Sequence, residues 1–583
     1  MSLPVRQETG DIFAMPERMP GAPRFSGSGS QPGRIRHERR GCAVFGGLVG
    51  NSQAGATDVR DMVNLVPGGF PALVTGNARP LYLAVPSSAP SGAVPHGMVF
   101  HDGKLVFSLG TELYLSTACG ISRRLGYAGD TDKRFASYGN LLFILPDKLV
   151  YDSSDDSLSP FTVDTGYLTN VTVESHQLLI DTGVLKTLGF HVGDGIRLDA
   201  KDNVASTALG GYYRISKLTE TCLGVEGGFP VQGTFTVRVS RVMPDLDGIC
   251  ACGDRLYGFS GRTVYVCEAG NPWNWYRAAS SVPDSTPFSL TTADGQSFTA
   301  CTAWQGYPVL FKADGIVRVM GRATAAGKRV SVSDVMLSEQ AGPGIPAGQA
   351  STLCELDGAL YYCSNFEVYR YAGASPARVD DGLPEGLYGI CAGTDGRSLF
   401  LTVRETNSAP RLYLYRPGRG WYRQEAVHMP AMLQRPAETA AGQGPVCLMQ
   451  RSDGYIYVTR SFAPALTAGF LPSTVPTPDA MAEFGDETSL LPDGGRLLTV
   501  FVRAVGLTGS QMKVYVRYDG AGDWTLLSTV AGTGREELIR IPVPPRPCSW
   551  FRLKLSFSGA GVPGRPDGVF RVSGLWWDTE QGG

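Results

Sequence analysis

Histidines are the side chains that most often carry acid–base or metal chemistry, and this chain has six of them. A metal site or an acid–base pair needs two or more such groups within reach of one another. None of the six stands at the spacing of a metal-binding helix motif. His96 and His101 flank the start of a strand, and we expect structural or exposed roles for them. The full set is His37, His96, His101, His176, His191 and His428.

Two acidic groups could also carry chemistry. Asp152, Asp155 and Asp156 lie in one short run that resembles a calcium loop, but the run lacks the glycine and the distal bidentate glutamate. We expect a solvated turn. Asp245 and Asp247 could act as paired carboxylates, although at this spacing a turn or cap role is the better interpretation. No phosphate-binding glycine loop and no nucleophile elbow occurs, so the sequence predicts no enzyme and no cofactor.

The chain has twelve cysteines. Most of them lie inside strand patterns and behave as small apolar residues. Cys250 and Cys252 have no second pair nearby, so their spacing is not that of a zinc site. We expect reduced thiols and no structural metal. The strand-pattern cysteines are Cys250, Cys267, Cys301, Cys354, Cys363, Cys391 and Cys447.

Two further clusters could contact a partner. Trp273 and Trp275 flank Asn274 after an Asn-Pro pair, which predicts a tight turn with a large apolar payload. This turn is either a plug at the end of a repeat or a platform for a carbohydrate. The second cluster is basic, and it is either a solvated tether or a contact to an acidic partner or to nucleic acid. It consists of Arg34, Arg36, Arg39 and Arg40.

Composition bounds the class of protein. The chain has 583 residues, of which 43% are apolar and 10% aromatic, so two or more domains with substantial cores are expected. Its 52 basic and 54 acidic residues leave a net charge of −2, so the protein has no general attraction to nucleic acid. No run of about 18 apolar residues occurs, and no membrane span is expected. The first residues lack the apolar core of a secretion signal.

The element that must position these residues is a recurring phrase of three short strands, with a small or acidic residue and a glycine between the first two. A meander this short cannot bury its own apolar face, so the copies must pack against one another. Radial packing of such units gives a β-propeller. The copies span residues 98–115, 249–267, 301–319 and 353–371, with weaker ones at 138–151, 390–415 and 447–458.

The rest of the chain is also predicted to be all-β, because short apolar runs are separated by many of its 74 glycines and 39 prolines. The repeats are interrupted by a stretch with its own five or six strands, which predicts a small inserted barrel. Long strictly alternating strands at the end predict a jelly-roll-type sandwich. The division is a strand-free arm 1–40, propeller 41–160, barrel 161–242, propeller 243–460, linker 461–483 and sandwich 484–583.

Several phrases resemble structural proteins of tailed-bacteriophage virions, and the resemblance covers roughly residues 58–580. The order of the phrases is more specific than any one of them. They are DMVNL at 61–65 with PAL at 71–73, PDLD at 244–247, DRLYG at 254–258, TVYVCEAGNPWNW at 263–275, FKADGIVRVMG at 311–321, DGALYY at 357–362, VYRYAG at 368–373, VYVRYDG at 514–520 and RPCSWFRLK at 546–554.

The resemblance is to propeller-containing hub or nozzle proteins of short-tailed phages. It implies a homo-oligomeric ring, of six copies in the relatives, that lies below the portal and adaptor and through which genomic DNA passes without specific binding. It also implies a virion protein assembled in the host cytoplasm. The second hypothesis is a receptor- or glycan-binding propeller of a phage tail, in which the Trp273–Trp275 region grips a sugar.

Overall fold

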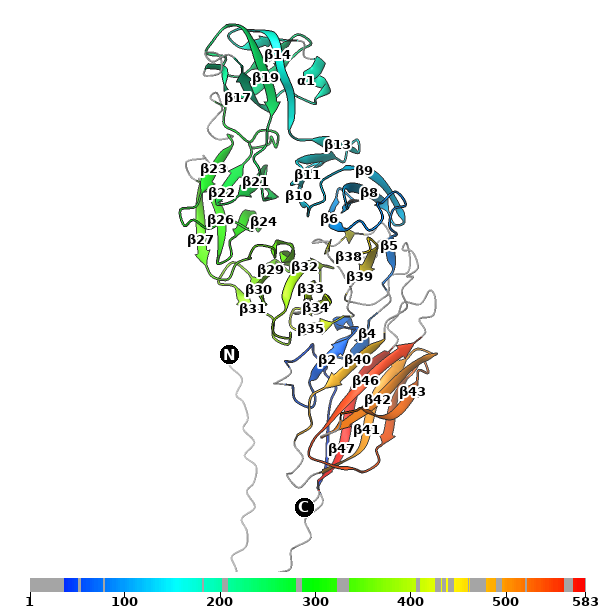
Figure 1. Ribbon diagram of the computed structural model, residues 1–583. Helices are drawn as coiled ribbons and strands as arrows, with labels where there is room; N and C mark the ends of the chain where they lie inside the picture. The colour runs from blue at the N-terminus through cyan, green and yellow to red at the C-terminus, as the bar shows by residue number, and fades with distance from the viewer. Residues whose placement is uncertain are drawn as a thin grey trace, which may run out of the picture.

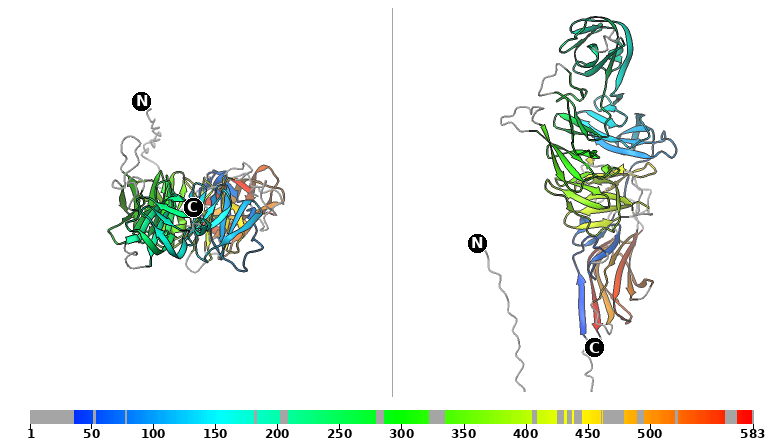
Figure 2. Two further views of the ribbon diagram at one scale, coloured as in Figure 1. Left: turned by 90° about the horizontal axis from the view of Figure 1, so that it is seen from above. Right: turned by 60° about the vertical axis from the view of Figure 1, so that its left-hand side comes forward.

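The computed structural model describes residues 36–50, 54–76, 79–180, 183–201, 208–278, 286–321, 335–404, 409–424, 431–432, 437–438, 445–459, 461, 479–488, 495–519, 522–559 and 570–581. These residues are nearly all β. The helical elements among them are short: α1 (Gly183–Thr187), η1 (Pro67–Gly69) and η3 (Ala350–Thr352). Figures 1 and 2 show three β bodies in a row, a barrel, a ring of small sheets and a sandwich.

Seven small antiparallel sheets make up the ring within the described residues, and each holds one copy of the recurring sequence phrase. We call them blades 1 to 7. Blade 1 has β6 (Pro95–His101), β7 (Lys104–Leu109), β8 (Glu112–Ala118) and β9 (Ile121–Tyr127); blade 2 has β10 (Arg134–Tyr138), β11 (Leu141–Leu145), β12 (Leu149–Asp152) and β13 (Ser157–Pro160); blade 3 has β20 (Gly248–Cys252), β21 (Arg255–Ser260), β22 (Thr263–Val266) and β23 (Phe288–Thr291).

The later blades follow the same pattern. Blade 4 has β24 (Ala300–Trp304), β25 (Tyr307–Phe311), β26 (Gly315–Gly321) and β27 (Val335–Ala341); blade 5 has β28 (Cys354–Leu356), β29 (Ala359–Ser364), β30 (Glu367–Tyr371) and β31 (Ala377–Arg378); blade 6 has β32 (Tyr388–Thr394), β33 (Leu399–Arg404), β34 (Arg411–Arg416) and β35 (Gly420–Arg423); blade 7 has β36 (Ala431–Met432), β37 (Ala437–Glu438), β38 (Pro445–Gln450), β39 (Ile456–Thr459) and β5 (Leu81–Leu83).

Except between blades 4 and 5, the first strands of successive blades contact one another around the ring, and β36 returns to β6. Between blades 4 and 5 the link is a shared core, in which the indole Nε1 of Trp304 donates to the carbonyl of Gly358 at 3.0 Å. Blade 7 is closed by β5, a strand from the start of the chain that pairs with β39. This arrangement is a β-propeller, as the repeats predict.

The glycine in each phrase is needed by the turn between the first two strands of a blade. Asp102 and Gly103 have φ of 48° and 72°, and Asp357 and Gly358 have φ of 50° and 70°. Two successive residues with positive φ make the type I′ turn, whose twist matches that of the flanking strands. In blades 1 and 5, an aspartate followed by glycine is therefore the local signal that sets the hairpin.

The barrel lies between blades 2 and 3. Its six strands close in the order β14 (Val163–Val173), β15 (Gln177–Leu179), β18 (Cys222–Val225), β17 (Gly211–Leu218), β16 (Gly195–Ala200) and β19 (Gly233–Arg241). The barrel has a core of its own, which includes Leu178, Leu223 and Val237 with no measurable exposure. The predicted small barrel is confirmed, with six strands.

The sandwich consists of two sheets. One holds β3 (Leu65–Val66), β4 (Leu73–Thr75), β47 (Phe570–Gln581), β41 (Gly495–Gly506) and β44 (Glu536–Pro542), with β1 (Arg36–Cys42) and β45 (Pro547–Cys548) at its margins. The other holds, in order, β2 (Val59–Val63), β40 (Ala480–Phe484), β46 (Phe551–Gly559), β42 (Ser510–Tyr518) and β43 (Thr525–Ala531).

The division predicted for the start of the chain is wrong in one respect. Residues 36–75 supply four strands to the sandwich, whereas residues 1–40 were expected to be strand-free and 41–160 to belong to the propeller. The reason is the twelve-residue β47, whose backbone edge needs a partner. β4 pairs with Arg571 and Val572, and β1 pairs from Leu575 to Gln581. Of the predicted linker, residues 462–478 lie outside the described residues, and residues 480–484 form β40.

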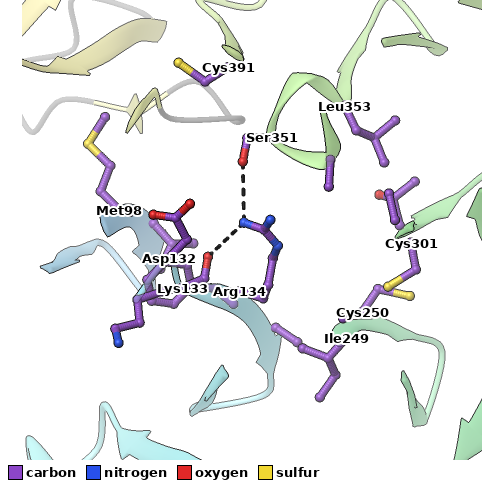
Figure 3. A pocket seen from close by; sticks show the side chains of 18 of the residues that line it. Met98, Asp132, Lys133, Arg134, Ile249, Cys250, Cys301, Ser351, Leu353 and Cys391 are labelled. Carbon is purple, nitrogen blue, oxygen red and sulfur yellow. Dashed lines mark hydrogen bonds between the residues drawn. The ribbon is translucent and has the colours of Figure 1, made fainter. Parts of the chain in front are cut away.

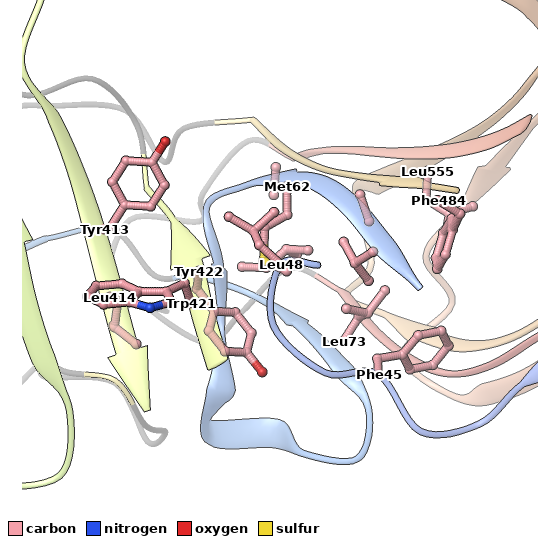
Figure 4. Close-up of a cluster of buried hydrophobic side chains, with 14 of the residues drawn as sticks. Phe45, Leu48, Met62, Leu73, Tyr413, Leu414, Trp421, Tyr422, Phe484 and Leu555 are labelled. Carbon is pink, nitrogen blue, oxygen red and sulfur yellow. The ribbon is translucent and has the colours of Figure 1, made fainter. Parts of the chain in front are cut away.

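The sandwich and blade 6 share one hydrophobic core (Figure 4). Trp421 and Leu414 of blade 6 are buried in the same cluster as Leu48 and Met62 of the segment that leads into the sandwich. The amide of Gln424 donates to the carbonyl of Leu65 at 2.7 Å across this boundary. A continuous core therefore joins the propeller to the sandwich.

Candidate functional site

The inner strands of the propeller surround an axial cavity of about 530 Å³ (Figure 3). Arg134, at the start of β10, points into it, and its Nη1 donates to the carbonyl of Lys133 and to the hydroxyl of Ser351, each at 3.4 Å. Cys250 and Cys301 line the same cavity from neighbouring blades. The hydrogen bond between their thiols, together with burial, raises the pKa of Cys250. The cavity could therefore hold a small ligand on a guanidinium, two thiols and an apolar wall.

The structure brings His96 to the mouth of this cavity together with two aspartates. Its Nε2 lies 2.8 Å from Asp130 and its Nδ1 lies 3.2 Å from Asp132. His101 is buried, with its Nε2 3.0 Å from the carbonyl of Asn140. The remaining histidines do not join these sites: His37 lies on β1, His176 and His191 lie in the barrel, and His428 lies outside the described residues.

The acidic run in blade 2 uses its carboxylates within the fold. Asp156 accepts hydrogen bonds from the Nζ of Lys104 at 2.6 Å and from the hydroxyl of Tyr151 at 2.7 Å. These bonds, with that from Lys104 first, lower the pKa of Asp156 to about 2. Asp152 accepts from the backbone and side chain of Ser154, and Asp155 accepts from the backbone of Ser157. These contacts stabilise a turn. The carboxylate oxygens therefore do not point toward one common centre, as the ligands of a calcium ion must.

Asp245 and Asp247 have separate partners. Asp245 pairs with the Nζ of Lys148 at 2.5 Å, and this bond lowers the pKa of Asp245. Asp247 accepts from the backbone nitrogen of Gly261 at 2.9 Å, which fixes a turn of blade 3. The two carboxylates thus hold two different segments and do not form an acid–base pair.

The twelve cysteines are free thiols. Burial raises the pKa of several strand-pattern thiols to about 12, which leaves almost no thiolate near neutral pH. These are Cys267, Cys354, Cys363 and Cys391. Among the described residues, no group of three or more histidine, cysteine, aspartate or glutamate side chains is placed to hold a metal ion.

The basic cluster is divided by the structure. Arg34 lies outside the described residues, and Arg36 is the exposed first residue of β1. Arg39 makes two hydrogen bonds with the carboxylate of Asp578, at 2.7 and 2.9 Å. Arg40 bonds Glu38 at 2.8 Å and the buried Glu487 at 3.2 Å. Arg39 and Arg40 therefore tie β1 to its own sandwich, and a contact of the cluster with a partner stays a prediction.

The two tryptophans lie at the junction of the barrel and the propeller. Trp275 is 3% exposed, so it has no face to offer to a partner, and its assignment to a partner contact is corrected. Trp273 is half-buried and stacks on Phe161, with ring centroids 5.3 Å apart. The same turn reaches the barrel through Asn271, whose Nδ2 donates to the carbonyl of Gly193 at 2.6 Å. The turn is thus a plug that seats the barrel.

Sequence reasoning missed the charged residues of this junction. Arg241 and Asp194 form a buried ion pair at 2.8 Å, and each side chain is 3% exposed. Arg214 of the barrel bonds the buried Glu268 of blade 3 at 3.2 Å. Each pair joins residues about 50 positions apart, and no spacing in the sequence marks them. Only the alternation of the barrel strands, which places one face inward, limits where such pairs can form.

No helix in the described part of the chain is both long and apolar enough to span a membrane. No family model matches the chain, and no curated protein matches it. Solved structures that are similar include the mitotic checkpoint complex (TM-score 0.32, 9% identity, 70% of this chain and 96% of that one) and the AfRom2 CNH domain (0.31, 8%, 65% and 97%). PorZ of the type-IX secretion system of Porphyromonas gingivalis has a TM-score of 0.28 at 11% identity, covering 84% of this chain and 82% of that one.

Proposed function

We propose that this protein is a structural subunit of a bacteriophage tail, of the hub or nozzle class, in which several copies form a ring that conducts DNA below the portal and adaptor. The ordered phrases between residues 58 and 580 that resemble such proteins are the first support. The axial cavity and the polar clusters described above offer no arrangement of acid, base and nucleophile that would favour an enzyme.

The observation that carries the proposal is the continuity of the three bodies. The propeller and the sandwich share one core, and the barrel is seated on blades 2 and 3 by the packing of Trp273 on Phe143 and Phe161 and by the ion pair of Arg214 with Glu268. Close-packed interiors have low compressibility and transmit strain. A subunit built in this way suits a conduit that must keep its shape while DNA under pressure passes.

The balance of charges in the chain supports the passage of DNA without tight binding. Each basic group that contacts phosphate adds binding by releasing counterions. The chain has nearly equal numbers of basic and acidic residues, and many described arginines are paired within the fold, as Arg238 is with Asp164 and Arg552 with Glu483 and Asp486. Six copies, a place in the virion tail and assembly in the host cytoplasm are part of the same proposal.

The strand order supports a jelly-roll type for the sandwich. One sheet runs β4-β47-β41-β44 and the other β40-β46-β42-β43. A jelly roll is a pair of sheets of this kind, in which most successive strands cross from one sheet to the other, and among these strands only β42 and β43 follow one another within one sheet. In that scheme β4 is the first strand and β40 the second, so the propeller and barrel are one long insertion between them.

Receptor or ligand binding is the second candidate, and the axial cavity with Arg134 pointing into it favours it. The aromatic turn no longer supports it, because Trp275 is buried. Binding of a glycan would have to use the cavity or a surface of the barrel. A monomer retained on a glycan array would support this candidate over the ring.

The test of the proposed function is a density map of the virion with this protein tagged at its carboxyl end. We expect a closed ring below the portal whose lumen admits duplex DNA. Density at the tip of a peripheral fibre would refute the conduit role. Absence of the protein from the particle would refute the proposal altogether.

A further inference from the structure

One strand at the margin of the sandwich has an open backbone edge. In the part of the chain that the structure describes, β43 is the last strand of its sheet, and no strand lies beyond it. Its seven residues, TLLSTVA, include no charge and no proline. Exposed edges are normally protected by charges, prolines or bulges, because their free N–H and C=O groups pair readily with another chain. β43 has one irregularity, opposite Val514 and Tyr515, and otherwise lacks these devices.

Two other edge strands differ in this respect. The neighbouring β44 carries Glu536, Glu537 and Arg540 and ends in Pro542. The outer strand of blade 1, β9, carries Arg123 and Arg124. These charges discourage the addition of a strand. β43 is therefore an edge that the rest of the molecule leaves ready for pairing.

A row of side chains on the outer face of this sheet crosses β46 and β42 and ends at β43. Leu526 of β43 lies opposite Tyr515 of β42, which lies opposite Lys554 of β46. The Nζ of Lys554 sits 4.8 Å from the centre of the Tyr515 ring and 4.4 Å from that of Trp524. Cross-strand neighbours of this kind stabilise a sheet. Leu526 is 49% exposed, so the row stops at a half-covered leucine, where one more strand would place an apolar neighbour.

The chain contains a segment that fits this edge. Thirty-five residues precede β1. Within them, residues 5–15 (VRQETGDIFAM) form a run free of proline between Pro4 and Pro16, and they carry apolar Val5, Ile12, Phe13 and Met15. A strand that adds to an edge must donate its backbone N–H groups, which excludes proline from its interior.

The direction of β1 favours a neighbouring copy as the acceptor. Arg36 pairs with Gln581 and Cys42 pairs with Leu575, so the chain enters the sandwich at the end where β47 finishes, away from the propeller (Figure 1). β1 belongs to one sheet and β43 to the other. Thirty-five residues extend up to about 115 Å, which is enough to reach an adjacent subunit.

We infer that residues 5–15 of one copy add a strand to the β43 edge of a second copy, with an apolar side chain beside Leu526. This inference rests on the proposed ring, because a closed ring requires the same contact between each subunit and the next. It names the surface that receives the arm.

The test uses the full-length chain with a photo-reactive phenylalanine analogue in place of Leu526, prepared from an equal mixture of ¹⁴N- and ¹⁵N-labelled protein. We expect cross-links from position 526 to residues 5–15 that join differently labelled chains. The same analogue at Ile121, which is 62% exposed on β9, is the matched control and should give none. Cross-links within one labelled chain only would overturn the inference, as would assembled protein without any cross-link to residues 5–15, or protein that stays monomeric as its concentration rises.

A substitution gives an independent check. Leu526→Lys places a charge on the open edge and should weaken self-association at least tenfold, whereas Ile121→Lys should leave it unchanged. Because both side chains are exposed, both variants should keep the melting temperature of the parent. A ring seen in the virion without arm cross-links would overturn the arm contact but leave the proposed function standing. Cross-links between chains of a protein that is absent from the tail would support the arm contact and overturn the proposed function.

Discussion

The guanidinium of Arg241 lies 4.4 Å from the centre of the Trp273 ring, and this contact joins the last strand of the barrel to the turn between β22 and β23 of blade 3. Arg241 also donates to the carbonyl of Phe161, at 3.0 Å, just where the chain leaves the propeller. The two ends of the inserted barrel and the aromatic turn therefore meet at one charged side chain, which holds the barrel on the propeller.

Trp273→Ala should loosen this junction. The substitution removes the stacking on Phe161 and the ring under Arg241, and we expect a loss of about 3 kcal/mol in the free energy of unfolding. Urea denaturation followed by tryptophan fluorescence and circular dichroism measures it. Arg277→Ala, at an exposed position in the same segment, is the control and should change stability little. Equal losses in the two variants would show that Trp273 does not seat the barrel.

The buried pair of Arg241 and Asp194 should behave non-additively. Either Asp194→Asn or Arg241→Met alone should lower the free energy of unfolding by about 3–5 kcal/mol, because it leaves the other charged side chain buried without a partner. The double variant should lose less than the sum of the two, since no unpaired charge is left. The exposed pair of Arg197 and Asp199 should cost under about 1 kcal/mol when broken. Additive losses at Arg241 and Asp194 would contradict a coupled pair.

Asp156 should make stability depend on acidity. Because its pKa in the folded protein is lowered to about 2, its contribution is fully present above the ordinary carboxyl pKa near 4 and is lost as pH falls toward 2. The difference in melting temperature between the parent and Asp156→Asn should therefore shrink over that interval. Asp155→Asn removes a charge but keeps an oxygen that can accept the turn hydrogen bond from Ser157, and it serves as the control. If the difference in melting temperature between the parent and Asp156→Asn grew toward low pH, the ionised carboxylate of Asp156 would not be the form that stabilises the fold.

The strand-buried thiols should resist alkylation. Since burial raises the pKa of Cys354, Cys363 and Cys391 to about 12, iodoacetamide at pH 8 should leave them unmodified in the folded protein and modify them in urea. Peptide mass spectrometry locates the labels. Labelling of these residues within minutes in the folded state would mean that the blades open far more often than their packing indicates.

Replacing residues 163–241 with a short Gly-Ser loop should leave a cooperatively folded remainder. The barrel has its own core, and loop-closure entropy changes slowly with length, so blades 2 and 3 can still meet. We expect a lower melting temperature, because Trp273 and Glu268 lose their barrel partners. Thermal unfolding by calorimetry checks this; aggregation of the remainder would show that the barrel completes the propeller core.

The sequence alone determined the features that depend on neighbours along the chain. Each blade is a meander whose strands follow one another, and pairs such as Asp102-Gly103 fix its turns through backbone conformation. The inserted barrel could be predicted for the same reason, because all its strands lie between residues 163 and 241. Local hydrogen bonding and period-two alternation are written into such segments.

Tertiary structure alone decided the pairings between distant segments. Leu81–Leu83 closes blade 7 against β39, and Leu73–Thr75 joins the last strand of the sandwich, nearly 500 residues away. Strands of three residues have no readable periodicity, and a backbone edge accepts a partner through N–H and C=O groups that every residue carries. The same holds for the site residues. Arg39 contacts Asp578, and Trp273 contacts Arg241, only because the fold brings together the segments that carry them.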